Sequence, residues 1–351
     1  MIRNFVTVIC TVLMVFSTIQ LNAQGKDQKH KVIVGGFYNL ENLFDTEDDT
    51  LILDEEFLPT GTRAWTEDLY KEKLANMAYT IGQIGISDVS AGLSFLGVSE
   101  VENRKVLEDL VQQSFIANRN YQIIHYDSPD RRGVDVAFLY NPSHFHPISS
   151  KAYPLILFDG DERRYTRDIL YVKGTIETDT FHILVNHWSS RGGGEAKTAP
   201  ARNKGAALCR TVIDSLRSIN PKVKCIVMGD LNDDPTNDSL KKHLRAVSNI
   251  KDVKKTGMFN PFEDMYRRGM GSNAYRDAWS LFDQIIISEG LALKDNDGYY
   301  YYKANIFNKN YLIQKKGKYK GYPMRTFDGD TYQGGYSDHF PTYIYFVKKI
   351  D

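Results

Sequence analysis

The chain has 351 residues, with 44 basic and 44 acidic side chains and no formal net charge at pH 7. This balance lacks the overall positive charge that would by itself indicate nucleic-acid binding, although it is compatible with a local basic groove. The apolar content of 42% provides for a sizeable core and excludes a disordered or collagen-like protein.

The first 23 residues are typical of a secretory signal peptide. Arg3 precedes an apolar run over residues 5–19, and Ala23 ends a small-residue segment before a polar stretch. The run is short for a membrane anchor, which needs about 20 apolar residues. We therefore expect cleavage after Ala23 and export to the periplasm or the outside of the cell. The mature chain would have no stable membrane insertion, and its two cysteines, Cys209 and Cys225, are too few for a disulfide framework.

The remaining chain alternates predicted strands and helices, assigned from apolar runs, periodicity and end signals. In chain order these are strand 32–38, helix 66–85, strand 93–98, helix 106–116, strands 121–124, 134–140, 169–176 and 181–185, helix 201–219, and strands 225–228, 282–287 and 343–347. No repeat or long linker divides them. We expect one domain over residues 24–351, an α/β fold of two packed, largely antiparallel sheets with helices outside.

Three loops have more than one interpretation. The acidic segment 45–59 approaches a calcium-loop spacing, but Thr50 stands where the sharp turn needs glycine, which favours a solvated loop. The segment Lys315–Lys320, with Tyr319 among its lysines, is either a contact for a phosphate backbone or an exposed hairpin. Arg191 with Gly192–Gly194 is either an anion-binding lid or a flexible loop.

Polar clusters end several of the predicted strands, where strand ends converge on one rim. These are Asn39, Glu100, Asp230 with Asn232, and Asp338 with His339. Carboxylate and amide oxygens suit a hard cation such as Mg²⁺ or Mn²⁺. An Asp–His pair supplies a base, and an amide can stabilise charge that builds on a phosphoryl oxygen.

The order of these motifs resembles the endonuclease/exonuclease/phosphatase family over nearly the whole mature chain. The motifs are Asn39, Glu100, Asn186-His187, Gly229-Asp230-Leu231-Asn232, Asp283 at the start of a strand, and Ser337-Asp338-His339. Each motif alone is a weak or moderate indication of the family, whereas the ordered set is specific for it. The resemblance implies a four-layer α/β sandwich with a metal site at one edge of the two sheets.

For the metal, the resemblance implies three positions. Glu100 corresponds to the main ligand and Asn39 to a residue that completes or orients the metal shell. Asp338 corresponds to a second-metal ligand or to the partner that orients His339. The expected cation is Mg²⁺ or Mn²⁺, with Ca²⁺ as a further option.

For catalysis, the resemblance implies roles for five side chains. Asp230 corresponds to a water-activating or leaving-group-side aspartate, and Asn232 to a phosphate-stabilising amide. His187 matches the mid-chain histidine of the nuclease and phospholipase branches, and Asp283 an aspartate that braces the phosphate side. His339 would contact the scissile phosphate or act as the base, and the sequence does not decide between it and Asp230.

The family hydrolyses several kinds of phosphate ester, so the substrate depends on variable loops. The two histidines and the lysine-rich segment favour a nuclease that acts on nucleic acid, and we expect a monomer. The alternatives are a sphingomyelinase-like phospholipid or inositol-phosphate phosphoesterase, for which the tyrosines at 299–302 offer an apolar contact, and a catalytically silent module that binds a phosphate ligand or a partner.

Overall fold

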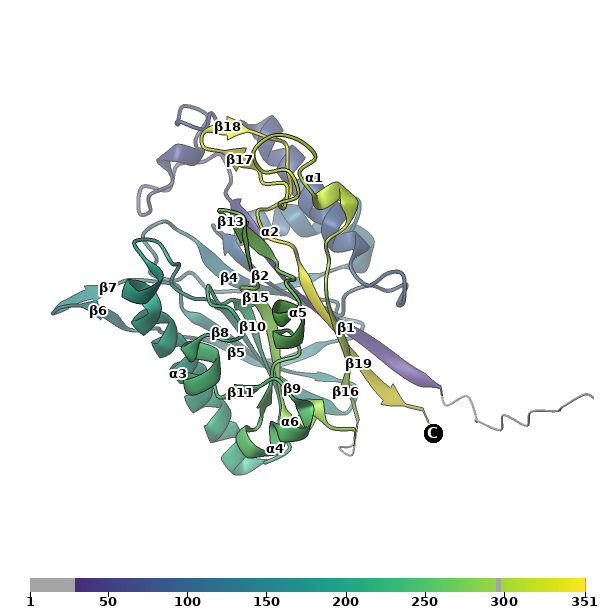
Figure 1. The fold of residues 1–351 in the computed structure, drawn as a ribbon. Helices are drawn as coiled ribbons and strands as arrows, with labels where there is room; N and C mark the ends of the chain where they lie inside the picture. The colour runs from purple at the N-terminus through teal and green to yellow at the C-terminus, as the bar shows by residue number, and fades with distance from the viewer. Residues whose placement is uncertain (1–28, 295–297, 351) are drawn as a thin grey trace, which may run out of the picture.

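The structure, a computed structural model, describes residues 29–294 and 298–350. The signal peptide predicted for residues 1–23 lies outside the described residues, so cleavage and export remain predictions. Two large sheets pack face to face and helices cover their outer sides (Figure 1). The predicted α/β sandwich is therefore confirmed. Among the described residues, none of the helices combines the length and the apolar character needed to cross a bilayer.

The first sheet has the strand order β16-β19-β1-β2-β4-β3. Its strands are β1 (His30–Leu43), β2 (Phe95–Val101), β3 (Gln122–His125), β4 (Asp135–Tyr140), β16 (Tyr300–Ile306) and β19 (Thr342–Lys349). Neighbours pair antiparallel except β1 and β2, which are parallel. The parallel pair brings the carboxyl ends of β1 and β2 to the same edge, where the predicted Asn39 and Glu100 lie.

The second sheet has the order β11-β12-β15-β10-β9-β8-β5. Its strands are β5 (His146–Tyr153), β8 (Ile169–Ile176), β9 (Asp179–His187), β10 (Lys224–Asp230), β11 (Ala246–Val247), β12 (Met258–Phe259) and β15 (Asp283–Ser288). The strands β9 and β10 are parallel, as are β11 and β12, and the other neighbours are antiparallel. In the part of the chain that the structure describes, three short hairpins lie outside the sheets: β6 (Leu157–Asp159) with β7 (Glu162–Arg164), β13 (Asn273–Tyr275) with β14 (Ala278–Ser280), and β17 (Phe327–Asp328) with β18 (Thr331–Tyr332).

The helices form the outer layers. They are α1 (Glu67–Gln83), α2 (Arg104–Val111), α3 (Glu195–Ile219), α4 (Val253–Thr256), α5 (Glu263–Arg267) and α6 (Glu289–Ala292). Figure 1 shows α1 and α2 beside the first sheet and α3 along the outer side of the second. The apolar face of α3 packs on that sheet through Ala206, Cys209 and Ile213. Cys209 and Cys225 are both buried free thiols.

The main core fills the space between the sheets. Phe37, Phe95, Val185, Met228 and Ile285 are fully buried there. Burial of such side chains removes apolar area from water at about 25 cal/mol per Å², which stabilises the packed pair of sheets. The core therefore holds the rim residues of both sheets in fixed relative positions.

Several predicted boundaries were wrong, each for a local reason. The helix predicted from residue 201 begins at Glu195, with Pro200 inside it, because a proline near a helix start loses little hydrogen bonding. The helix predicted over 106–116 ends at Val111, and turns follow it. The strands β5 and β16 were not predicted, since both lie at sheet edges. The residues of β5 are exposed or half-buried, and those of β16 mix exposed with buried side chains, so neither strand has a continuous apolar run.

Candidate active site

Two backbone irregularities direct Asn39 and Glu100 to the rim. The pairing of β1 with β2 shifts register between Asn39 and Leu43, and that of β2 with β4 shifts between Ser99 and Val101. Bulges of this kind re-aim side chains at sheet edges. Glu100 itself has φ 59°, a backbone conformation that is unfavourable for a residue with a β-carbon and costs about 1–3 kcal/mol. The packing around Glu100 offsets this cost and fixes its carboxylate.

The second sheet presents a row of three polar side chains. Asp230, at the end of β10, pairs in register with His187 on β9 and with Asp283 on β15. Residues that face each other across strands project from the same side of a sheet, so the three side chains meet. A β-carbon at Gly229 would lie 2.2 Å from the Asn186 carbonyl oxygen, which explains why glycine precedes Asp230.

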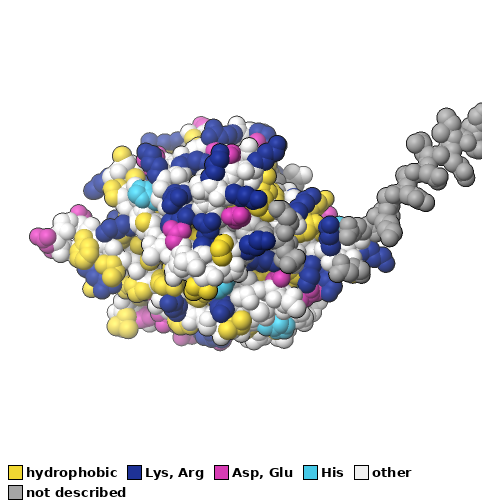
Figure 2. All heavy atoms as spheres, turned by 90° about the horizontal axis from the view of Figure 1, so that it is seen from below, with side chains coloured by type: hydrophobic (Ala, Val, Ile, Leu, Met, Phe, Trp, Pro, Cys, Tyr) yellow, Lys and Arg dark blue, Asp and Glu magenta, His cyan; other side chains and the backbone are white. Residues whose placement is uncertain are grey.

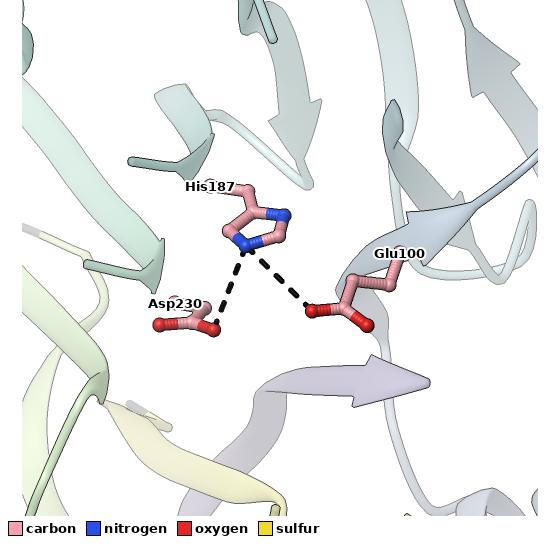
Figure 3. Close-up of side chains that lie close together, drawn as sticks. All are labelled: Glu100, His187 and Asp230. Carbon is pink, nitrogen blue, oxygen red and sulfur yellow. Dashed lines mark ion pairs between the residues drawn. The ribbon is translucent and has the colours of Figure 1, made fainter. Parts of the chain in front are cut away.

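The first cluster joins the two sheets. The His187 Nε2 atom lies 3.7 Å from Glu100 Oε1 and 3.7 Å from Asp230 Oδ2 (Figure 3). The Asn39 amide nitrogen donates to the same two carboxylate oxygens, at 3.0 Å each. Its Oδ1 accepts the Glu41 backbone N–H at 2.8 Å, which holds this amide orientation. The carboxylates and the imidazole have the spacing of a metal-ligand set, and Asn39 orients the two carboxylates.

The second cluster surrounds His339. Its Nδ1 lies 2.6 Å from Asp283 Oδ2, and its Nε2 lies 3.9 Å from Asp230 Oδ2. Asp338, the partner suggested by the sequence, instead lies 3.8 Å from Nε2 and pairs with Arg325 at 3.1 Å. Asp283 is therefore the orienting partner of His339, because β15 delivers it directly under the imidazole.

The electrostatics of the two histidines differ. Burial would lower the pKa of His339, but Asp283, Asp230 and Asp338 together raise it well above its usual value. Burial, followed by the positive charges of Arg167 and Arg132, lowers the pKa of His187 well below its usual value. His187 is consequently a neutral imidazole that can donate a lone pair to a cation, whereas His339 carries positive charge toward an anion.

The pKa of Asp230 is raised by burial and by the neighbouring carboxylates of Asp283 and Glu100. Asp230 and Asp283 are buried and Glu100 is half-buried, and three carboxylates in such proximity exceed the single positive charge of His339. A divalent cation supplies the missing positive charge, so the donor set fits the metal that the sequence predicts.

Asn232 and Arg191 lie beside the row. The Asn232 amide nitrogen donates to the Trp188 carbonyl at 3.0 Å, and its backbone N–H donates to Asp230 Oδ1. Arg191 pairs with Asp233 and Asp234, at 3.3 and 3.1 Å, and its Nε donates to the Asn232 carbonyl. With its donors engaged in this way, Arg191 clamps the loop after β10 and does not offer them to a ligand.

Two contributors were missed by sequence reasoning. Arg167 is 6% exposed, and it donates to the carbonyls of His187 and Trp188 at 3.1 and 2.7 Å. Ser272 donates to Asp283 Oδ2 at 2.6 Å. Neither sits in a recognisable motif, and a buried arginine or a loop serine gives no signal before its partners are known.

The comparisons with known proteins agree with this geometry. The sequence profile of the endonuclease/exonuclease/phosphatase family matches residues 34–348, and the chain belongs to that family. It is thus an enzyme of the phosphoesterase class, whose members generally depend on a divalent metal. A search of curated protein sequences finds no match.

Solved structures share the fold at low identity. A family protein from Bacteroides thetaiotaomicron is 14% identical, with a TM-score of 0.54 over 92% of this chain and 100% of that one. D. rerio TDP2 with a single-strand DNA product is 12% identical, with a TM-score of 0.52 over 90% and 98%. A mannosyl-6-phosphatase from B. thetaiotaomicron is 14% identical, with a TM-score of 0.51 over 91% and 100%. At these identities the likeness concerns the fold alone.

Proposed function

We propose that the protein is a divalent-metal-dependent phosphodiester hydrolase that acts on nucleic acid. The observation that carries this proposal is the position of Asp230 Oδ2, which has His187 Nε2 at 3.7 Å on one side and His339 Nε2 at 3.9 Å on the other. The Asp230 carboxylate and the neutral His187 imidazole can bind a cation, and the charged His339 imidazole can bind an anion. Hydrolysis of a phosphodiester needs both kinds of group within one site.

Glu100, Asp230 and His187 would hold the cation, and Asn39 would keep the two carboxylates in place. We propose Mg²⁺ or Mn²⁺, because oxygen-rich sites with one imidazole suit these ions and Ca²⁺ prefers more oxygen ligands. When bound, the ion supplies Lewis-acid charge stabilisation and lowers the pKa of a water. The residues around it must then bind the phosphate, orient it and move a proton.

His339 performs the phosphate-side work in this proposal. Asp283 fixes its Nδ1, so that Nε2 points toward Asp230 and toward the space where the scissile phosphate would lie. A protonated imidazole there binds a phosphoryl oxygen and can give its proton to a leaving group. Asp230, whose Oδ2 lies within 4 Å of both imidazoles, is the group proposed to accept the proton of the attacking water.

The flank of the site supports nucleic acid over the alternatives. Arg325 pairs with Asp338 and stacks on Tyr319, at 5.4 Å from its ring, so the predicted lysine-rich segment lies beside the site. Of the tyrosines at 299–302 proposed for lipid contact, the last three belong to β16 and Tyr299 directly precedes it. Tyr300 pairs with Val347 at the end of β19 remote from His339. A silent binding module is disfavoured, since every carboxylate and imidazole of the site is present.

Export to the periplasm or outside the cell, and a monomeric state, complete the proposal. They rest on the leader sequence and on a site assembled within one chain. Mass spectrometry of the protein secreted from a bacterial host, with cleavage after Ala23 as the expected result, tests the first. Light scattering tests the second.

A substrate panel tests the activity. Plasmid DNA, RNA, sphingomyelin, inositol phosphates and bis(4-nitrophenyl) phosphate are incubated with Mg²⁺ or Mn²⁺, with and without chelator. We expect chelator-sensitive hydrolysis of nucleic acid and a loss of about 10²–10⁴-fold in Glu100→Gln and His339→Ala. Hydrolysis of sphingomyelin or inositol phosphates alone would reject nucleic acid as the substrate. Full activity in both variants would reject the assignment of Glu100 and His339 to the active site.

A further inference from the structure

A groove with an excess of basic side chains lies next to the site. It has a volume of about 490 Å³ and is lined by segments 130–132 and 162–167 together with Asp159 and Ser190. The first segment precedes β4, and the second runs from β7 toward β8. Figure 1 shows the β6–β7 hairpin projecting from the body at the left. The groove therefore lies between this hairpin and the rim.

The floor of the groove is continuous with the catalytic residues. Arg167, which lines it, donates to the carbonyls of His187 and Trp188 and pairs with Asp130 at 2.8 Å. Arg167 and Arg132 are also near enough to lower the pKa of the His187 imidazole. A ligand in the groove would thus be an immediate neighbour of a substrate at His187.

The charges in the groove are unbalanced toward positive. Five arginines face three carboxylates, and Asp130 is already paired with Arg167 and with Arg132 at 3.2 Å. Arg131, Arg163 and Arg164 are exposed, and among residues 29–294 and 298–350 none of them has a carboxylate within ion-pair distance. The arginine fork matches phosphate oxygens, so these side chains form a site for anions.

Thr166 and Tyr165 also line the groove. Thr166 is 2% exposed, and its hydroxyl has no hydrogen-bond partner within the described part of the chain. Tyr165 is 43% exposed, and the Arg163 guanidinium lies 4.8 Å from its ring centre. An exposed ring beside arginines is the arrangement on which an unpaired base stacks.

We propose that this groove is a subsite for a single-stranded nucleic-acid extension of the substrate. Arg131, Arg163 and Arg164 bind phosphates next to the scissile one, and Tyr165 stacks a base. The inference rests on the proposed function for the identity of the adjacent reaction. It goes beyond that function because it assigns strand selection to the β6–β7 hairpin.

A lipid surface is the competing ligand. Phe158 on the same hairpin and Ile156 just before it are 57% and 49% exposed. Figure 2 shows Asp and Glu side chains at the left tip, where this hairpin projects, and hydrophobic, Lys and Arg side chains behind the tip. Phe158 and Ile156 are not part of the groove lining, however. The arginines line a concave surface that leads to His187, which suits a strand better than a flat membrane.

Binding is measured by fluorescence anisotropy, with a short fluorescein-labelled single-stranded oligonucleotide in EDTA, so that hydrolysis plays no part. We expect Arg163→Ala/Arg164→Ala to reduce the slope of log Kd against log salt by about 0.7 for each phosphate that the variant no longer neutralises. Arg163→Lys/Arg164→Lys should retain most of the slope. Tyr165→Ala should weaken binding about tenfold at every salt concentration.

The matched control removes two positive charges elsewhere. Lys254 is exposed on α4 and Lys251 is exposed just before it, at the end of β15 remote from Asp283. Lys251→Ala/Lys254→Ala should keep the wild-type salt slope. An equal loss in this control would show nonspecific attraction and overturn the subsite.

The remaining outcomes separate the subsite from the proposed function. Wild-type protein that hydrolyses nucleic acid while the arginine and tyrosine variants bind like wild type would overturn the subsite alone. Weakened binding in those variants supports the subsite even if no nucleic acid is hydrolysed. If Phe158→Ser abolishes binding to phosphatidylserine vesicles and the groove variants keep their oligonucleotide affinity, the hairpin is a membrane contact and the proposal is wrong.

Discussion

His339 donates its Nδ1–H to Asp283 Oδ2 over 2.6 Å, and the same carboxylate oxygen accepts the Ser272 hydroxyl at 2.6 Å. Asp283 is fully buried, so its charge is directed to the imidazole and not to water. This pair fixes the tautomer of His339 and leaves Nε2 toward the metal-side carboxylate Asp230.

Asp283→Asn should therefore reduce kcat by about 10²–10⁴-fold with little change in the fold. The asparagine keeps the size of the side chain but loses the charge that supports the protonated imidazole. The measurement is kcat on the best phosphodiester from the panel, with circular dichroism to verify folding. Ser272→Ala, which removes the two hydrogen bonds between the Ser272 hydroxyl and Asp283 but leaves the Asp283 charge in place, should have a much smaller effect. Equal losses in the two variants would contradict the orienting role of the Asp283 charge.

Glu100→Gln should weaken Mg²⁺ or Mn²⁺ binding by at least tenfold, because one ligand loses its charge. Isothermal titration calorimetry on the substrate-free protein measures this independently of turnover. Glu102→Gln is the matched control two residues away. Burial raises the pKa of Glu102 to about 8, so this carboxyl is mostly protonated at pH 7 and glutamine closely replaces it. Similar metal affinities for Glu100→Gln and wild type would remove Glu100 from the ligand set.

Much of this site was predictable because its residues end buried strands. Asn39, Glu100 and Asp230 follow apolar runs, and the parallel pairs β1–β2 and β9–β10 bring such ends to one rim. The pairing of His339 with Asp283 was not predictable in the same way. This pairing arises because Asp283, the neighbour of Asp230 on β15, lies under the loop before β19 that carries His339. The sequence alone favoured Asp338, which is adjacent to His339 along the chain.

The buried polar contacts behind the rim could not be predicted from the sequence either. Lys73, on α1, would be assigned to the solvent-exposed face of an amphipathic helix. In the structure it is fully buried and donates to the Tyr336 carbonyl at 2.7 Å and to the Thr326 hydroxyl at 2.5 Å. Tertiary contacts of the C-terminal loop determine this burial, and they lie more than 200 residues away along the chain.

Lys73 forms a buried ion pair with Glu41 at 3.9 Å, and Glu41 also accepts two hydrogen bonds from Thr326. Lys73→Met should lower the free energy of unfolding by about 1–3 kcal/mol at pH 7, because the hydrogen bonds of Lys73 to Tyr336 and Thr326 are lost. Burial raises the pKa of Glu41 to about 7 even beside Lys73, so without the lysine its carboxyl is buried in the protonated form. Chemical denaturation measures the loss. Glu41→Gln/Lys73→Met should be less destabilised than the single variant. If the double variant instead shows the sum of the two single losses, the residues are not coupled.

His182, remote from the site, should control part of the acid stability. Its Nδ1 accepts the Tyr171 hydroxyl at 2.7 Å, and burial lowers its pKa from 6.5 to about 4, with Lys173 adding to the effect. The unfolded chain therefore binds this proton first as the pH falls. The neutral imidazole contributes fully to the free energy of unfolding above pH 6.5. This contribution is lost progressively between pH 6.5 and 4, and the total loss is about 3 kcal/mol.

Urea denaturation at a series of pH values from 7 to about 4 tests this dependence. His182→Gln should be less stable than wild type at pH 7, because it loses the bond to Tyr171, but its stability should fall less steeply as the solution is acidified. His146→Gln, an exposed position on β5, controls for the general effect of replacing a histidine and should keep the wild-type steepness. Identical pH profiles for His182→Gln and wild type would mean that His182 gains its proton as readily in the folded as in the unfolded chain.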